Sequence, residues 1–175
     1  MKKILAFGAS SSKNSINKKF AKYVAGQFRN ADAELLDLND YEMPIYSVDK
    51  EQASGIHKKA LDFAQKIDLS DLLIISLAEH NGAYSTAFKN IFDWVSRIPD
   101  RDTWGGKNIL LLSTSPGKRG AATVLEIAKN YFPHSGGGIK GTFSLPEFYQ
   151  NFDEDKGISD KKLNADLQKI IKSIV

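Results

Sequence analysis

The amino-acid sequence predicts an α/β fold, a doubly wound five-stranded parallel sheet of order 2-1-3-4-5 with helices on both faces. Apolar segments of strand length alternate with segments of helical periodicity along the 175 residues. Two apolar segments, 72–77 and 108–113, show no polar alternation, as in parallel strands covered on both faces. Right-handed crossovers between parallel strands place the helices on both sides. We therefore expect one layered domain over residues 1–175.

The first half of the chain begins with a strand and a helix on either side of a polar loop. The apolar run Ile4–Phe7 ends at Gly8, and apolar residues recur at helical spacing after a loop rich in hydroxyl and amide side chains. Ser54-Gly55 is expected to open a later helix. The expected elements, in order, are strand 4–7, helix 15–29, strand 33–38, a connection over 39–50 and helix 54–67.

The second half repeats the alternation of strands and helices. Pro99 closes the helix that follows the third strand. Ser159-Asp160 is expected to cap the last helix, whose apolar residues return every three or four positions. The expected elements, in order, are strand 72–77, helix 86–97, strand 108–113, a helix through 124–128, strand 139–145 and a C-terminal helix to Ile174.

Three polar loops follow strands of the predicted sheet: the first loop (8–17), the second loop (78–85) and the third loop (114–120). In the 2-1-3-4-5 topology, ligands bind beyond the carboxyl ends of the strands, where the winding reverses between the first and third strands. The three loops are expected at that edge, and they are the richest in glycine, serine and asparagine next to strands. The sequence therefore predicts one composite site.

Composition limits the class of protein. The net charge is +3, and lysines are interspersed with acidic residues, so we expect no nucleic-acid partner. The absence of cysteine excludes disulfides, thiolate metal sites and a cysteine nucleophile, and no metal is expected. The apolar run 4–7 is far shorter than the ~20 residues that span a bilayer. We expect a cytoplasmic protein with no membrane partner.

The first loop predicts a phosphate site because it joins a strand to a helix N-terminus, where backbone N–H groups lack intrahelical partners. The G-x-G-x-x-G of dinucleotide folds does not follow the first strand, and the sequence contains no G-x-x-x-x-G-K-[ST] of nucleoside triphosphatases. Phe7-Gly8 and Leu77-Ala78 stand where a phosphate-accepting response regulator needs acidic residues. A loop that encloses one terminal phosphate, as in flavin mononucleotide (FMN), remains. The alternative is a serine-rich turn that merely caps a helix.

Two segments resemble the NADPH-dependent FMN reductase family. Residues 79–97 contain E-H-N-G-A-Y-S and then K-N-I-F-D-W-V-S-R, similar to the family patterns P-E-Y-N-G-S and K-N-A-I-D-W-x-S-R. The first loop, G-A-S-S-S-K-N-S-I-N, is similar to the family's phosphate loop G-S-x-R-x-x-S-x-N. The resemblance implies a flavodoxin-like fold, bound FMN, hydride transfer from NADH or NADPH, and a homodimer or homotetramer.

By position, the resemblance assigns three groups of residues to FMN. The first would hold the phosphate, the second would lie along the isoalloxazine ring, and the third would bound the pyrimidine edge or the approach of the nicotinamide. The groups are Ser10, Ser12, Ser15, Ile16 and Asn17; Glu79, His80, Asn81 and Gly82; and Ser113, Ser115 and Gly117. Hydride transfer to a flavin needs no obligatory side-chain acid, so no catalytic residue is assigned, and His80 is the candidate for proton transfer.

The sequence departs from the family pattern at three places. Ala78 replaces a proline, His80 replaces a tyrosine, and a serine replaces the arginine of the first loop, with Lys13 displaced by an insertion. The last departure leaves the choice between NADPH and NADH open. Quinones, free flavin, azo compounds and oxidised metal ions are all plausible acceptors, and the sequence ranks none of them.

Two other functions compete with the reductase. A flavodoxin-like electron carrier would bind FMN without a nicotinamide site of its own, although flavodoxins are commonly acidic and this chain carries +3. A flavin-free scaffold would be the outcome if the loops had decayed.

Other residues have plain structural interpretations. Asp93 and Arg97 lie four apart on a helix and would form a surface ion pair. Gly82 would permit a positive φ. The remaining expectations are core or interface packing for Phe92 and Trp94, structural roles for His57 and His134, and solvated charge or a nicotinamide phosphate contact for Lys118 and Arg119.

Overall fold

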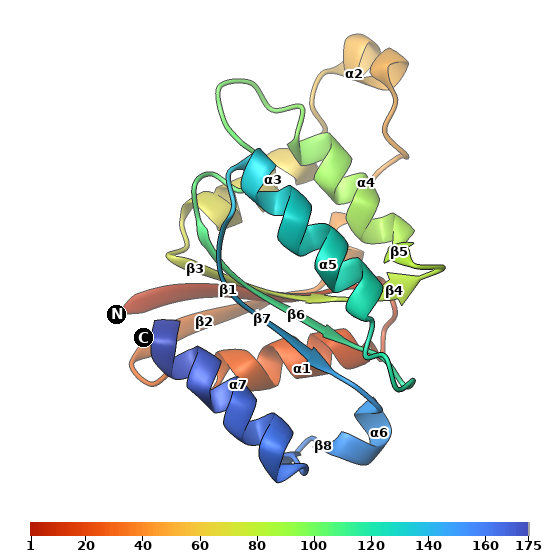
Figure 1. Cartoon of the computed structure of the whole chain (residues 1–175). Helices are drawn as coiled ribbons and strands as arrows, with labels where there is room; N and C mark the ends of the chain where they lie inside the picture. Colours follow the sequence, from red (N-terminus) through yellow and green to blue (C-terminus); the bar gives the residue numbers. More distant parts are fainter. Residues whose placement is uncertain (175) are drawn as a thin grey trace.

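The computed structural model describes residues 1–174 and contains a five-stranded parallel sheet (Figure 1). The strand order is β2-β1-β3-β6-β7, which is the predicted order 2-1-3-4-5 once the short strands outside this sheet are set aside. The strands are β1 (Lys2–Ala9), β2 (Ala31–Leu36), β3 (Leu72–Leu77), β6 (Asn108–Thr114) and β7 (Gly138–Leu145). The fold is therefore flavodoxin-like, and the predicted fold class is confirmed.

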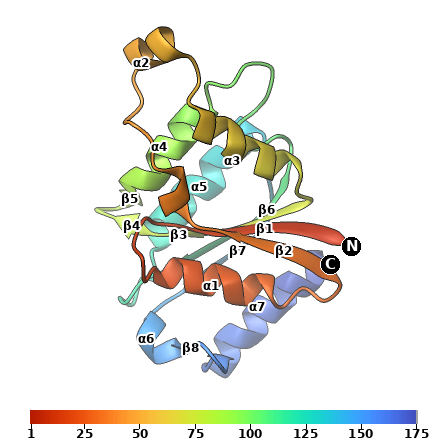
Figure 2. The ribbon, with the colours of Figure 1, turned by 180° about the vertical axis from the view of Figure 1, so that it is seen from behind.

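Helices cover both faces of the sheet (Figures 1 and 2). One face is covered by α1 (Ile16–Ala25) and α7 (Lys161–Ile174). The other is covered by α3 (Lys58–Asp68), α4 (Thr86–Val95) and α5 (Ala122–Tyr131). Successive strand residues point to opposite faces, so β3 sends Leu73 and Ile75 into one hydrophobic cluster and Leu72 and Ile74 into the other. This double burial explains why β3 shows no polar alternation.

Short elements connect the main layers. The connection after β2 contains η1 (Leu38–Tyr41) and α2 (Val48–Ser54), and α2 projects from the body and buries no residue (Figures 1 and 2). The others are the hairpin β4 (Glu79–His80) with β5 (Ala83–Tyr84), η2 (Phe132–Ser135), α6 (Phe148–Asn151), and the pair β8 (Phe152–Asp153) and β9 (Gly157–Ile158).

The prediction that Ser54-Gly55 opens a helix is wrong. Ser54 ends α2, and Gly55 follows it with a φ of 70°, a conformation that favours glycine after a helix C-terminus. The next helix, α3, begins at Lys58 after His57, whose Nδ1 accepts the N–H of Lys59. His57 therefore has the structural role expected of it. A serine-glycine pair can either start or end a helix, and the sequence pattern did not distinguish the two.

Close packing of α1 against β1 depends on Gly8. A Cβ atom at this position would lie 2.2 Å from the backbone nitrogen of Lys18, far inside van der Waals contact. The glycine thus lets the first turns of α1 sit directly against the end of β1. As a result, the N-terminus of α1 lies at the carboxyl edge of the sheet.

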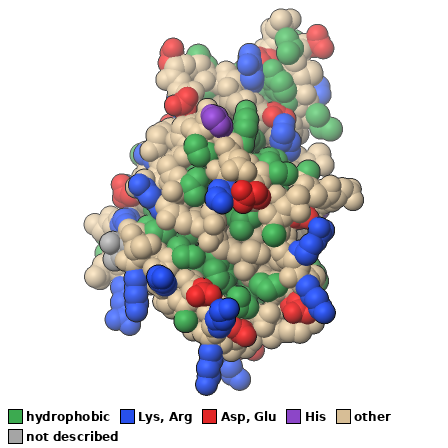
Figure 3. Space-filling model, in the orientation of Figure 1, with side chains coloured by type: hydrophobic (Ala, Val, Ile, Leu, Met, Phe, Trp, Pro, Cys, Tyr) green, Lys and Arg blue, Asp and Glu red, His purple; other side chains and the backbone are tan. Residues whose placement is uncertain are grey.

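Charges on the surface are mixed in sign. Figure 3 shows lysine, arginine and acidic side chains interspersed over the face on which α4, α5 and α7 lie. Within residues 1–174, none of the helices combines the length and apolar character required to cross a bilayer.

Candidate functional site

The first, second and third loops meet around one cavity of about 240 Å³, which we call the loop cavity. Each loop contributes residues to the lining of this cavity, as the topology predicts. The lining residues are Ser10, Ser12, Asn14, Ser15, Ile16, Asn17, Ala78, Glu79, His80, Thr114, Ser115, Pro116 and Tyr149. Eight of the twelve residues that the resemblance assigned to FMN are among them, and Asn81, Gly82, Ser113 and Gly117 are not.

Ser15 caps α1 and leaves amides free beside the cavity. Its hydroxyl oxygen accepts the N–H of Lys18 at 3.1 Å, while its own N–H donates to the carbonyl of Ser12. Within the described residues, the N–H groups of Ile16 and Asn17 have no hydrogen-bond partner. Unpaired amides at a helix N-terminus, with the dipole behind them, attract an anion.

The side chain of Asn17 joins three elements instead of facing a ligand. Its Nδ2 donates to the carbonyl of Thr114 at 3.2 Å, and its Oδ1 accepts from Ser76 Oγ at 2.7 Å and Thr114 N–H at 3.2 Å. The residue is 3% exposed. Asn17 therefore ties α1 to β3 and β6, and only its backbone amide is available to a phosphate.

Glu79 fastens the second loop to the start of α5. Its Oε2 accepts the N–H of Val124 at 3.0 Å, and its Oε1 lies 3.8 Å from Arg119 Nη2. Ala121 precedes α5 with a φ of 61° and provides no side-chain cap. Glu79 therefore caps α5 from a distant part of the chain. Its carboxylate is also attracted by the positive end of the helix dipole. Arg119 is otherwise solvated, with its side chain 81% exposed.

The tip of the second loop is a tight hairpin between β4 and β5. Glu79 pairs with Tyr84 and His80 pairs with Ala83, so Asn81 and Gly82 form the two-residue turn. Their φ values are 53° and 77°, as a type I′ turn requires. The expectation of a positive φ at Gly82 is confirmed, and turn geometry explains the Asn-Gly pair without a ligand. His80 is exposed at the cavity wall.

Ser115 lines the cavity, whereas its two assigned neighbours do not. Ser113 is fully buried, and its hydroxyl donates to the carbonyl of Gly120 at 2.7 Å. The Gly117 carbonyl accepts N–H groups from Gly120 at 3.2 Å and Glu147 at 3.0 Å. Both residues therefore shape the third loop from outside the cavity.

Tyr149 lines the cavity from α6, and sequence reasoning missed it. It is 70% exposed and belongs to no motif of the resemblance. Its position just after β7, at the carboxyl edge of the sheet, is the signal that could have identified it.

Side chains of α4, and Arg97 just after its end, only partly match the expectations. Phe92 and Trp94 are buried in the hydrophobic core, which confirms their packing role. The predicted ion pair between Asp93 and Arg97 is wrong. Asp93 pairs with Lys89 at 2.6 Å, and Arg97 Nε pairs with Glu51 Oε2 at 2.9 Å. The same-helix partner of Asp93 lies one turn before it, and Arg97 points toward α2.

The groups around the loop cavity fit a flavin mononucleotide. Hydroxyl groups of three serines and two unpaired amides surround the place where a phosphate monoester would sit, and the second and third loops provide walls for a ring. Within residues 1–174, no three His, Asp or Glu side chains gather as a metal site requires. Free N–H groups and hydroxyls at a helix N-terminus suit an anionic group such as a phosphate.

Comparison with known proteins gives the family. The model of the NADPH-dependent FMN reductases matches residues 2–150. The chain belongs to this family. As a member of the NADPH-dependent FMN reductases, it is an NAD(P)H-dependent oxidoreductase that uses FMN as cofactor and a nicotinamide nucleotide as co-substrate.

Three proteins illustrate what this FMN reductase family member is similar to. An uncharacterized protein of Mycoplasma pneumoniae is 35% identical over 159 residues, 86% of this chain and 91% of that protein. A quinone reductase of Escherichia coli K12 is 32% identical over 81 residues, 46% of this chain and 43% of that enzyme. The solved structure of FerB, a flavoenzyme NAD(P)H:(acceptor) oxidoreductase of Paracoccus denitrificans, has a TM-score of 0.78 and 26% identity over 99% of this chain and 96% of FerB.

Proposed function

We propose that this enzyme binds FMN in the loop cavity and transfers electrons from a reduced nicotinamide nucleotide to a quinone. The observation that carries the proposal is the meeting of three loops around two unpaired helix amides and several serine hydroxyls. The choice of a quinone is supported by one relative, the E. coli quinone reductase, which is 32% identical over 46% of this chain. Free flavin, azo compounds and metal ions are the alternative acceptors, and each is compared with the quinone in the same assay.

The first loop would bind the phosphate. Ser10 and Ser12 would donate their hydroxyl protons, and the N–H groups of Ile16 and Asn17 would complete the set of donors. The hydroxyl oxygen of Ser15 would still accept the N–H of Lys18, while its proton forms a hydrogen bond to the phosphate. The first loop thus acts as an anchor.

The second and third loops would hold the ring. The backbone of Glu79 and His80 would face one edge, with Ser115 on the opposite wall. FMN supplies the redox chemistry, since its ring accepts a hydride and returns two electrons to an acceptor. Glu79 would act indirectly, because its bond to Val124 fixes the distance between the two loops. Asn81 and Gly82 would set the hairpin, and Ser113 and Gly117 the third loop.

The test is reconstitution of the purified chain with FMN. We expect FMN fluorescence to change on binding, and the loaded protein to oxidise NADH or NADPH when a benzoquinone is present. Binding without nicotinamide oxidation would favour the flavodoxin-like electron carrier instead. Failure to bind FMN would overturn the proposal and leave the flavin-free scaffold.

We also propose a homodimer or homotetramer located in the cytoplasm, as the family resemblance and composition suggest. Sedimentation equilibrium of the FMN-loaded protein tests the assembly, with a monomer at micromolar concentration as the contradicting result. Cell fractionation tests the location.

A further inference from the structure

The segment 42–57, which we call the arm, is held against α4 by two side chains of that helix. Asn90 Oδ1 accepts the N–H of Tyr46 at 2.8 Å, and Asn90 Nδ2 donates to the carbonyls of Met43 at 3.1 Å and Pro44 at 3.2 Å. Trp94 Nε1 donates to the same Pro44 carbonyl at 2.8 Å. The start of the arm is therefore fixed by hydrogen bonds to its backbone.

A second set of contacts fixes the arm beyond the end of α4, at Arg97. Arg97 Nε and the Tyr46 hydroxyl both donate to Glu51 Oε2, at 2.9 Å and 2.8 Å. The Tyr46 ring also packs edge-on against Trp94 with ring centres 5.2 Å apart. Asn90 and Trp94 lie on one face of α4, since they are four residues apart, and Arg97 follows the end of the helix. The arm is thus a fixed wall beside the helix.

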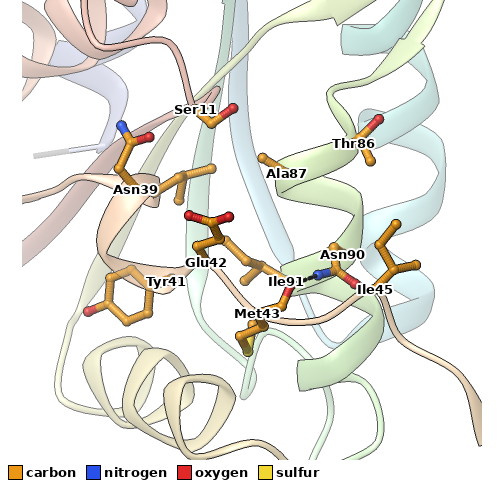
Figure 4. A pocket seen from close by; sticks show the side chains of 11 residues that line it. Ser11, Asn39, Tyr41, Glu42, Met43, Ile45, Thr86, Ala87, Asn90 and Ile91 are labelled. Carbon is orange, nitrogen blue, oxygen red and sulfur yellow. Dashed lines mark hydrogen bonds between the residues drawn. The ribbon is translucent and has the colours of Figure 1, made fainter. Parts of the chain in front are cut away.

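A second cavity, which we call the arm cavity, lies between this wall and the first turns of α4 (Figure 4). Its volume is about 420 Å³. Its lining residues are Ser11, Leu38, Asn39, Tyr41, Glu42, Met43, Ile45, Thr86, Ala87, Asn90 and Ile91. Ser10 and Ser12 line the loop cavity, whereas Ser11 lines this one, so the two cavities lie on opposite sides of the same loop.

Glu42 determines the charge of the arm cavity. Among its described lining residues, Glu42 is the one acidic side chain, and neither lysine nor arginine is present. Figure 4 shows its carboxylate pointing into the space between Ser11, Asn39 and Ala87. The carboxylate has no ion pair or hydrogen bond within the described part of the chain. An acceptor without a partner thus faces an open cavity.

The other walls combine apolar surface with hydroxyl donors. Met43, Ile45 and Ile91 provide the apolar surface, and Ile45 is 68% exposed. The hydroxyl groups of Ser11 and Thr86 lie on the side of the cavity toward the first and second loops. A ligand that matches these walls has a flat apolar ring, neighbouring hydroxyl groups and a phosphate on the side toward the loops.

We propose that the arm cavity binds the adenosine end of the reduced nicotinamide dinucleotide, with Glu42 accepting hydrogen bonds from the ribose hydroxyls. This inference rests on the proposed function and names the preferred co-substrate. NADH presents a free 2′-hydroxyl to Glu42, whereas the 2′-phosphate of NADPH would bring negative charge against the carboxylate with no cation to offset it. The enzyme therefore prefers NADH.

The test uses ADP-ribose and 2′-phospho-ADP-ribose, which carry the two adenosine ends without a reactive nicotinamide. Titration calorimetry on the FMN-loaded enzyme should give ADP-ribose an affinity about tenfold higher than its phosphorylated form. Glu42→Gln should remove most of this difference, and Glu42→Lys should reverse it. The matched variants Glu126→Gln and Glu126→Lys change an exposed carboxylate on α5 outside both cavities and should leave both affinities unchanged.

Steady-state kinetics provide a second measurement. The ratio of kcat/KM for NADH to that for NADPH should fall in Glu42→Gln through KM, with kcat and FMN affinity unchanged. Equal ADP-ribose affinity in wild type and both Glu42 variants, or no ADP-ribose binding, would overturn the inference. Those results leave the proposed function standing if FMN still binds and NADH is still oxidised, so the two failures are distinguishable.

Discussion

The N-termini of α1 and α5 lie at the same edge of the sheet but are completed in different ways. α1 is capped by its own Ser15, and within residues 1–174 the amides of Ile16 and Asn17 stay unpaired. α5 has no cap of its own and receives Glu79 from the second loop. A helix N-terminus beside the strand ends can bind an anion only where its amides stay free. At the start of α5, an amide is already bonded to Glu79, and this bond joins the second loop to the helix that follows the third loop.

The largest effect is expected from moving α1. Gly8→Ala would place a Cβ atom 2.2 Å from the backbone of Lys18, so α1 must shift away from β1. We expect a loss of about 3 kcal/mol or more in the free energy of unfolding, measured with urea. Gly26→Ala is the control, since its Cβ meets nothing closer than 3.4 Å and φ is −66°. Equal stability of the two variants would contradict the close packing.

The next effect distinguishes helix capping from phosphate binding. Ser15→Asp keeps a good N-cap but adds negative charge beside the free amides. We expect stability close to wild type and FMN binding weaker by about tenfold or more, measured by flavin fluorescence. Ser47→Asp makes the same change at the cap of α2, away from the loop cavity, and should leave FMN affinity unchanged. Unchanged affinity in Ser15→Asp would show that α1 does not face the phosphate.

A smaller effect is expected at the start of α5. Glu79→Ala removes the acceptor of the Val124 N–H, and we expect a loss of about 1–2 kcal/mol in thermal or urea unfolding, with weaker FMN binding. Glu79→Gln retains an acceptor oxygen and should restore most of the stability. If Glu79→Gln lost as much as Glu79→Ala, the charge near Arg119 and the helix dipole would matter more than the hydrogen bond.

The smallest effect concerns acid. A hydrogen bond from Lys18 lowers the pKa of Asp37, with help from the N–H of Asn39. Because the folded pKa lies below the unfolded one, this contribution to stability is present above the unfolded pKa of about 3.9 and is lost as the pH falls through the folded value. Asp37→Asn should therefore flatten the loss of stability below pH 4 by less than about 1 kcal/mol. An identical pH profile for wild type and variant would exclude this pair as a source of acid sensitivity.

The sequence was sufficient for the strand order and for the three loops, because parallel buried strands and their polar carboxyl ends leave local patterns. The positive φ at Gly82 was also predicted, since glycine adopts this conformation without a steric penalty. Contacts between segments distant in the sequence were not predicted. Nothing in the local sequence indicates that Glu79 caps α5 or that Arg97 pairs with Glu51, because both contacts depend on how loops pack after the sheet has formed.

The alternation of Ser10, Ser11 and Ser12 between the loop cavity and the arm cavity has a thermodynamic consequence. Both proposed ligands would contact the backbone of residues 10–12. If the FMN phosphate orders this backbone in the loop cavity, the dinucleotide bound in the arm cavity has less conformational entropy left to remove. Linkage then requires FMN and the dinucleotide to strengthen each other's binding by the same factor. The first loop would thus couple cofactor loading to co-substrate capture.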